Sequence, residues 1–216
     1  MKHTELDNMP GGVLAIHKGE GMTSHDVVNK VRRLYNTKRV GHAGTLDPLA
    51  TGVLVVLVGR AAKACEYISS DRKTYKATLR LGLTTDTEDI TGEVLTKSEN
   101  IPDSETVRAV CREFVGNLKQ IPPMYSAIKG EGRKLYELAR EGIVIERKPR
   151  PVTIYELDIL KIELPLIHLR ISCSKGTYIR SLCRDIGERL GCGGAMEHLT
   201  RTRVGEFVIE NAITLS

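Results

Sequence analysis

The residues best suited to chemistry lie in a glycine-rich segment, GHAGTLDPLATG, at residues 41–52. Its glycines allow a close approach of the backbone to a ligand, and Pro48 biases the preceding Asp47 towards an extended conformation. The carboxylate of Asp47 therefore sits on a stiff turn before the apolar run VLVVLVG. Such a carboxylate can act as a nucleophile or a base, or it can accept backbone N–H groups in a structural turn.

A second candidate is Arg180, in the segment KGTYIR at residues 175–180. Gly176 and Thr177 are expected to open a helix, so a cation at position 180 would oppose the helix dipole by up to about 1 kcal/mol. A buried carboxylate such as Asp47, or an RNA phosphate, would compensate this cost. The alternative is a solvent-facing arginine, with Asp185 one turn further along as a partner.

Two aromatic side chains are weaker candidates on their own. Tyr75 begins an alternating segment, TYKATLRL, on its apolar face, where a core tyrosine is the ordinary interpretation. His42 precedes Asp47 in the glycine-rich segment, which we expect to be a loop. Neither a phosphate-binding loop nor a dinucleotide fingerprint accompanies these residues, because their glycine spacings are absent.

The elements expected to position these residues are strands more often than helices. Hydrophobic periodicity and turn residues predict strands over 12–17, 53–59, 74–81, 91–96, 152–164, 166–174 and 202–209, and helices over 24–35, 61–68, 104–115, 135–140 and 177–190. Helices do not alternate with strands one for one. We therefore expect an α+β fold, with a mixed, largely antiparallel central sheet flanked by helices.

Charge and cysteine usage point to a polyanion partner and a reducing compartment. The net charge is +5, and acidic residues gather in segment 86–116, which leaves a more basic remainder. An ordinary solvated surface would also explain this pattern. The five cysteines have neither paired nor zinc-binding spacing, so we expect reduced thiols and a cytoplasmic location. No apolar run is long enough to cross a bilayer.

The glycine-rich segment, extended to GHAGTLDPLATGVL, resembles the active-site motif of the TruB-type tRNA pseudouridine-55 synthases. The resemblance continues in the same order through five further blocks: RKTYKATLRLG (72–82), TDTEDITGEV (85–94), IPPMYSAIKGEGRKLYELAREG (121–142), SKGTYIRSLCRDIG (174–187) and LTRTRVGEF (199–207). A collinear set of this kind is more specific than any single motif.

The resemblance implies the pseudouridine synthase fold and a reaction. The chain would flip a uridine out of the T-loop of tRNA, at position 55, and isomerise it by breaking and re-forming the glycosidic link. Asp47 matches the catalytic aspartate and Arg180 the arginine paired with it. Tyr75 matches the tyrosine that stacks on the target base.

Three further positions match substrate-binding residues of the family. His42 resembles the histidine that supports the disrupted base stack, and Tyr178 and Leu199 match pocket residues. The implied organisation is an N-terminal arm (1–11), a catalytic domain (12–216) and, within it, a basic insert at about 120–151 that clamps the T-arm. No PUA-type C-terminal RNA-binding domain is expected.

The isomerisation needs no redox change and no carried group, so we expect no metal and no organic cofactor. The expected partner is the T-arm of tRNA. We expect a monomer that needs no obligatory protein partner and does not bind a membrane. Alternatives are a tRNA-folding chaperone without chemistry, a synthase of the same family that acts on another RNA, and a structural ribosome-associated protein. Intact Asp47, Tyr75 and Arg180 favour the enzyme.

Overall fold

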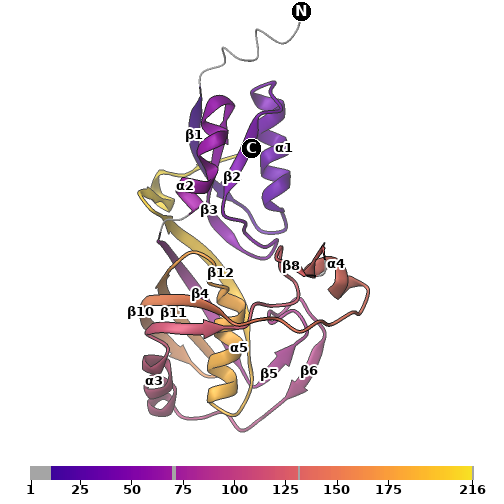
Figure 1. Ribbon diagram of the computed structural model, residues 1–216. Helices are drawn as coiled ribbons and strands as arrows, with labels where there is room; N and C mark the ends of the chain where they lie inside the picture. Colours follow the sequence, from indigo (N-terminus) through magenta and orange to yellow (C-terminus); the bar gives the residue numbers. More distant parts are fainter. Residues whose placement is uncertain (1–10, 70–71, 131, 216) are drawn as a thin grey trace, which may run out of the picture. The chain divides into compact units, whose positions relative to one another are not determined.

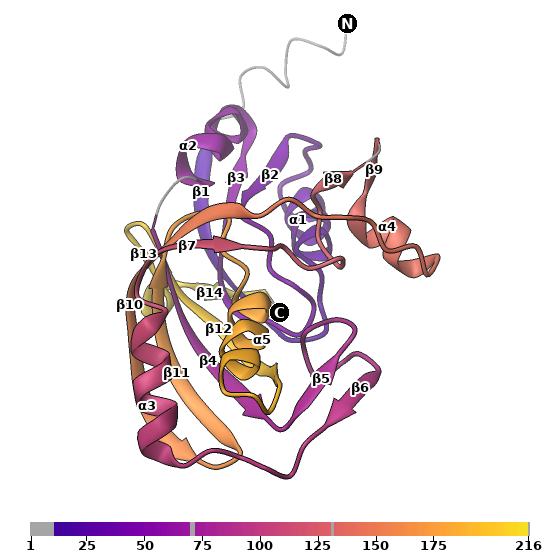
Figure 2. The same ribbon diagram turned by 60° about the horizontal axis from the view of Figure 1, so that its bottom comes forward.

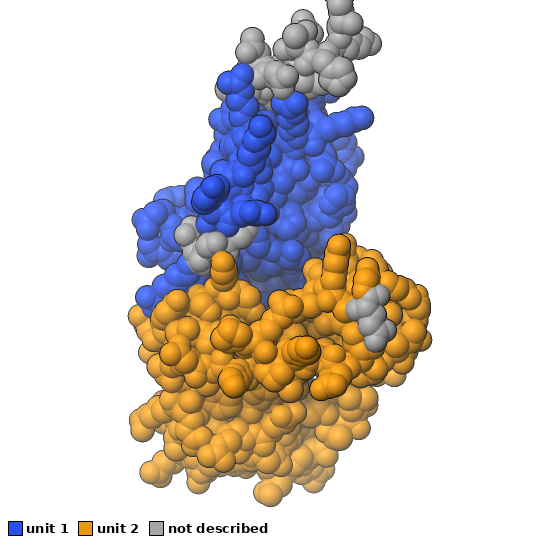
Figure 3. All heavy atoms as spheres, in the orientation of Figure 1, with its two compact units in different colours: residues 1–76, 198–216 blue, residues 77–197 orange. Residues whose placement is uncertain are grey.

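The computed structural model describes residues 11–69, 72–130 and 132–215. The expected N-terminal arm, 1–11, lies outside the described residues except for Gly11. The chain forms two compact units, unit 1 from residues 1–76 and 198–216 and unit 2 from residues 77–197 (Figure 3). Strands β4 (Lys73–Leu81) and β12 (Gly194–Val204) contribute residues to both.

Unit 1 is built on a buried strand, β3 (Thr51–Val58), whose residues Val53–Leu57 are fully buried. Strand β1 (Gly12–Lys18) and strand β2 (Val40–Ala43) both pair with β3 in antiparallel fashion. Strand β12 pairs with β3 in parallel, and β14 (Ile213–Thr214) with β1 in parallel. Strand β13 (Phe207–Val208) pairs with β12. Strand β3 is therefore apolar along its length because it is buried among the paired strands β1, β2 and β12.

Two helices accompany these strands (Figure 1). Helix α1 (Ser24–Leu34) begins with a capping box between Thr23 and Asp26, and it buries Val27, Val28 and Val31. Helix α2 (Cys65–Ser69) follows a 3-10 helix, Gly59–Ala64. The predicted helix over 61–68 is thus an α-helix only in its second half.

Unit 2 contains the strand order β12-β4-β11-β10-β7, with β10 (Arg150–Glu163) antiparallel to both β11 (Leu166–Cys173) and β7 (Gly116–Gln120). Helix α3 (Ser104–Glu113) lies beside β10 and β11, and α5 (Ile179–Arg189) lies beside β4 and β12 (Figure 2). Helix α5 buries Ile179, Leu182, Cys183 and Ile186, the spacing of a single apolar stripe.

Smaller elements complete unit 2. Strands β5 (Leu83–Thr85) and β6 (Val94–Lys97) form a separate ribbon. Between β7 and β10 the chain makes β8 (Lys129–Gly130), β9 (Arg133–Lys134) and α4 (Leu135–Arg140), to one side of the sheet in Figures 1 and 2. This segment has its own small core of Met124, Leu135 and Leu138. The helix predicted over 135–140 is confirmed.

The expected α+β class with a mixed sheet is confirmed, but the short strands β2, β5, β7, β8, β9 and β14 were not predicted. The elements that were predicted differ mainly at their ends. Helix α5 begins at Ile179 rather than at 177, because Tyr178 is its N-cap. The last long strand begins at Gly194, well before the predicted 202, and a turn at 205–206 separates it from β13. Strand β6 starts three residues later than predicted. Among the described residues, no helix has the length and apolar character to cross a membrane.

Candidate active site

Asp47 lies in the connection between β2 and β3 of unit 1. The two strands form an antiparallel hairpin, in which His42 pairs with Val56 and Ala43 with Val55. The expectation that His42 belongs to a loop is therefore wrong, since it is part of β2. Asp47 is half-buried, and its carbonyl oxygen accepts from the N–H of Ala50 at 3.1 Å. A short turn thus follows the carboxylate, as the Asp-Pro sequence predicts.

A buried serine fixes the residue before Asp47. The hydroxyl of Ser24 donates to the carbonyl oxygen of Leu46 at 3.0 Å, and it accepts from the N–H of Leu46 at 2.8 Å. Ser24 is the first residue of α1, and both it and Leu46 are buried. The capped start of α1 therefore holds the backbone that carries Asp47.

A fully buried arginine, Arg201, joins the two ends of the same connection. Its guanidinium donates to the carbonyl oxygens of Gly44 at 2.9 Å and Thr45 at 3.4 Å on one side, and of Val53 at 2.8 Å on the other. Arg201 is 1% exposed and is the largest fully buried side chain in the part of the chain that the structure describes. Because a planar guanidinium carries five donors in a fixed geometry, it can hold both ends of the connection at once.

Lys18, at the end of β1, holds the residue after Asp47. Its ammonium group donates to the carbonyl oxygens of Gly19 at 2.9 Å, Met22 at 2.7 Å and Pro48 at 3.3 Å. Burial lowers the pKa of Lys18 to about 8, and the nearby negative charge of Asp47 opposes this effect. Lys18 thus brings positive charge into the surroundings of Asp47.

One glycine of the motif is required by the protein's own packing. Gly52 pairs with Arg201 across β3 and β12 and has a φ of +99°. A Cβ atom at this position would lie 2.2 Å from the carbonyl oxygen of Arg201. We expected the glycines to admit a ligand, but at Gly52 the close neighbour is backbone of the same chain.

The other predicted residues of unit 1 lie on strands. Tyr75 is on β4 and Leu199 on β12, and both are buried. His42 is half-buried, and its Nδ1 has no hydrogen-bond partner among the described residues. Burial, with a smaller effect of Arg201, lowers the pKa of His42. A neutral imidazole therefore occupies this place at physiological pH.

Unit 1 also carries a basic hollow of about 800 Å³. Four cations line it: Lys38, Arg39, Arg60 and Lys63. Cys65, partly exposed at the start of α2, has its Sγ 2.8 Å from the point where a Cβ on Gly41, another lining residue, would lie. We define these four cations and the space between them as the basic hollow.

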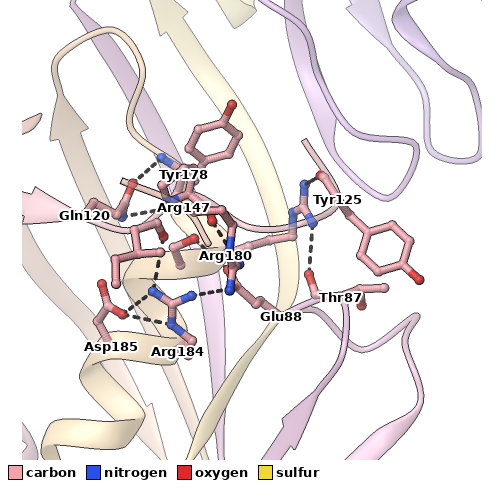
Figure 4. A network of polar contacts seen from close by, with 12 residues as sticks. Thr87, Glu88, Gln120, Tyr125, Arg147, Tyr178, Arg180, Arg184 and Asp185 are labelled. Carbon is pink, nitrogen blue, oxygen red and sulfur yellow. Dashed lines mark hydrogen bonds and ion pairs between the residues drawn. The ribbon is translucent and has the colours of Figure 1, made fainter. Parts of the chain in front are cut away.

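Arg180 is buried inside unit 2, with 4% of its surface exposed. Its guanidinium donates to the carbonyl oxygens of Thr87 at 2.9 Å and Tyr125 at 2.8 Å (Figure 4). Its Nε lies 3.7 Å from the carboxylate of Asp89. The alternative of a solvent-facing Arg180 paired with Asp185 is therefore wrong. Asp185 accepts from Arg184 instead, at 2.6 Å.

Tyr178, the N-cap residue of α5, is held by a glutamine at the end of β7. The side chain of Gln120 donates to the carbonyl oxygen of Tyr178 at 3.0 Å and accepts from its N–H at 2.8 Å (Figure 4). Gln120 is buried. A side-chain amide that satisfies both backbone groups of one residue fixes the start of the helix.

Four residues that support the site were missed from the sequence: Lys18, Ser24, Gln120 and Arg201. Polar residues at the ends of strands and helices are too common for their types to single them out, and their partners are backbone atoms that no motif reveals. In the described residues, no group of three or more His, Cys, Asp or Glu side chains could hold a metal ion.

Comparison with known proteins places this geometry in a family. A family model described as TruB family pseudouridylate synthase (N terminal domain) matches residues 32–179, and one described as tRNA pseudouridylate synthase B C-terminal domain matches residues 180–216. The chain is 52% identical over 204 residues to tRNA pseudouridine synthase B of Alkaliphilus oremlandii, covering 94% of this chain and 68% of that protein.

A second relative, tRNA pseudouridine synthase B of Clostridium kluyveri, is 52% identical and shares 94% of this chain and 71% of its own length. Among solved structures, a chain from the crystal structure of a Cbf5-Nop10-Gar1 complex matches with a TM-score of 0.73 at 32% identity. That match covers 94% of this chain and about half, 52%, of the solved chain. By these sequence and structural matches, the chain belongs to the TruB family of pseudouridylate synthases.

Proposed function

We propose that this protein converts uridine to pseudouridine in tRNA. Family membership carries the proposal, because the relatives that share most of their length with the chain are named tRNA pseudouridine synthase B. The finer assignment, uridine 55 of the T-loop, rests on the motif resemblance. We further propose a cytoplasmic monomer that needs no obligatory protein partner.

Isomerisation breaks the bond between N1 and C1′, turns the base, and joins C5 to C1′. The target nucleotide must first leave the folded T-loop, at a cost of a few kcal/mol. Stacking on aromatic side chains offsets about 1–3 kcal/mol per base. His42 and Tyr75 are the proposed aromatic groups, and a neutral His42 suits stacking because a neutral ring is less costly to desolvate.

Asp47 is the proposed catalytic carboxylate, attacking C1′ of the sugar or removing a proton at C2′. Either role requires a side chain whose backbone does not shift as the base leaves. The anchoring of Leu46 by Ser24 and of Pro48 by Lys18 supports this role, since a carboxylate fixed on both sides is preorganised for attack. Arg180 is the proposed partner of the catalytic carboxylate, and Tyr178 and Leu199 are proposed to line the base pocket.

Two basic regions support RNA binding. The basic hollow of unit 1 has four cations, and the segment between β7 and β10 carries further lysines and arginines: Lys129, Arg133, Lys134, Arg140, Arg147 and Lys148. Lysines and arginines on a surface neutralise phosphates and release counterions. We propose that the segment, the insert at about 120–151, closes on the T-arm.

The test is tritium release from an unmodified tRNA transcript that carries tritium at C5 of uridine. The proposal expects release from one T-loop position, mapped by replacing single uridines. Asp47→Asn is the matched control: it should abolish release while tRNA affinity stays within about tenfold, or 1.4 kcal/mol. Release mapped outside the T-loop would redirect the substrate to another RNA. Release from purified Asp47→Asn would disprove the role of Asp47.

A further inference from the structure

The segment from Thr85 to Gly92 turns sharply beside α5, and it supplies two of the groups that surround Arg180. The carbonyl oxygen of Thr87 accepts from Arg180 at 2.9 Å, and the carboxylate of Asp89 lies 3.7 Å from its Nε. The side chain of Glu88, the residue between them, points towards Ser181 and Arg184 in the next part of α5 (Figure 4).

We propose that Glu88 and Arg184 form a positioning pair for Arg180. The proposal rests on the proposed role of Arg180 in the reaction. In this proposal Glu88 does not contact the substrate. Arg184 is the cation that holds Glu88 in place, and Glu88 in turn holds its chain neighbours Thr87 and Asp89.

The contacts of Glu88 are buried and specific. One carboxylate oxygen accepts from the hydroxyl of Ser181 at 2.6 Å, and the other accepts from the guanidinium of Arg184. Glu88 is 7% exposed and Ser181 is fully buried. A buried carboxylate is costly unless it is paired and hydrogen-bonded, so the position of Glu88 depends on these two partners.

The spacing of the partners explains how one contact can set another. Arg184 lies four residues after Arg180 and three after Ser181 on α5, so its side chain neighbours both of them on the helix surface. Arg180 binds the residue before Glu88 and lies beside the residue after it, while Ser181 and Arg184 bind Glu88 itself. The segment and the helix are therefore joined at three consecutive residues, with Glu88 in the middle.

The backbone conformation of Glu88 also indicates that this residue is held in place by its surroundings. Glu88 has a φ of +64°, in the left-handed region that non-glycine residues rarely adopt. Its N–H donates to the carbonyl oxygen of Thr85 at 3.3 Å, and its carbonyl oxygen accepts from the N–H of Met196 at 3.0 Å. A residue held in a sparsely populated conformation needs surroundings that enforce it. The pair of Glu88 with Arg184 supplies the side-chain part of that constraint.

Arg184 extends the same support to the start of the insert. Its guanidinium also donates to the carbonyl oxygen of Ile121 at 3.3 Å, while Arg180 donates to that of Tyr125 at 2.8 Å. Arg180 and Arg184 thus each bind two segments: the turn around Glu88 and the chain that follows β7. Loss of the pair would release Thr87 and Asp89 together.

The experiment compares Glu88→Gln with the wild type in single-turnover tritium release at saturating tRNA. Glutamine keeps the shape and an acceptor for Ser181 but removes the buried anion that Arg184 binds, so that Asp185 remains as the close carboxylate of Arg184. We expect the rate constant to fall by about tenfold, with tRNA affinity unchanged, since a residue that acts through Arg180 does not touch RNA.

Asp158→Asn is the matched control, because it removes an exposed ion pair with Arg170 in the same unit. A second readout follows the side-chain Nε–H of Arg180 by nitrogen-15 NMR. It should shift and exchange faster in Glu88→Gln and stay unchanged in Asp158→Asn. Arg184→Lys, which keeps the charge, should show a smaller shift and replaces Glu88→Gln if that variant does not fold.

The outcomes separate this proposal from the proposed function. An unchanged Arg180 resonance in Glu88→Gln overturns the positioning pair, whatever happens to the rate. A wild-type rate in Glu88→Gln at saturating tRNA also overturns it. If the wild-type protein releases no tritium, the proposed function fails, and the Arg180 resonance still tests whether Glu88 and Arg184 fix this side chain.

Discussion

The ammonium group of Lys18 donates to the carbonyl oxygen of Pro48 at 3.3 Å, which brings a buried cation to the residue that follows Asp47. Lys18 is 1% exposed, and it also binds two carbonyls of the turn after β1. Its charge is therefore available to Asp47 only while the amine is protonated. This relationship makes the site sensitive to pH on the alkaline side.

Raising the pH should remove that charge, because burial lowers the pKa of Lys18 from 10.5 to about 8. We expect the single-turnover rate to fall as the pH rises through about 8. The stability contribution has the opposite sign: above pH 8 the unfolded lysine still binds a proton that the folded one has lost, so this contribution rises with pH up to about 10.5.

The measurement is the rate of tritium release at saturating tRNA across this pH range, with tRNA affinity followed in parallel. Lys18→Arg is the control, since a guanidinium does not titrate there. The alkaline fall should disappear in that variant. The same fall in wild type and Lys18→Arg would assign it to another group.

Substituting Arg201 should loosen the connection that carries Asp47. In Arg201→Gln, at least one of the three carbonyls loses its donor, at a cost of about 1–3 kcal/mol where the unsatisfied group is the buried carbonyl of Val53. Removal of the charge should also raise the pKa of His42, because Arg201 is one cause of its lowering. Thermal unfolding and an NMR titration of the histidine ring measure the two effects. Arg201→Lys should lower stability but leave the pKa of His42 near its wild-type value.

Arg180→Met should separate catalysis from RNA binding. Arg180 is buried and donates to protein carbonyls, so it releases no counterions when RNA binds. We expect turnover to fall by orders of magnitude, while the slope of log affinity against log salt is unchanged. Lys63→Met, in the basic hollow, should instead reduce that slope by up to about one unit. A reduced slope in Arg180→Met would make Arg180 a phosphate contact.

Amide exchange should show whether the insert closes on RNA. Among the described residues, its small core contains only Met124, Leu135 and Leu138 with partly buried neighbours, so local opening should be easy in the free protein. We expect slower exchange over residues 124–145 when tRNA is bound. Leu138→Ala should speed exchange there without tRNA while leaving β10 and β11 protected. Equal protection of the wild type with and without tRNA would contradict a clamp.

The sequence was most informative where one residue's neighbours in the chain decide its structure. The stripe of α5, the alternation of β4 and the turn after Asp47 are local patterns, and each is found as predicted. Arg201 could not be assigned in this way, because its acceptors lie about 150 residues earlier in the chain and are backbone carbonyls. The same applies to Gln120, which binds the backbone of Tyr178. Buried polar side chains that serve distant backbone leave no periodic signal.

The start of β12 shows a second limit. Residues Gly194–Leu199 are partly small and follow a glycine-rich turn, so their pattern did not indicate a strand. Their strand conformation comes from pairing with neighbours already in a sheet, which outweighs a weak local preference. The position of Leu199 as a predicted pocket residue was therefore found by motif and not by secondary structure. The proposed roles of the six site residues stay predictions.

The distribution of thiols offers a route to watching RNA arrive. Cys111, Cys173, Cys183 and Cys192 are buried, whereas Cys65 is partly exposed and lies next to Gly41, which lines the basic hollow. A maleimide dye should therefore attach preferentially at Cys65 in the native fold, without any engineered cysteine. Burial raises the pKa of this thiol, so labelling will be slow at neutral pH and faster in mildly alkaline buffer. Fluorescence from such a label would report the occupancy of the hollow directly.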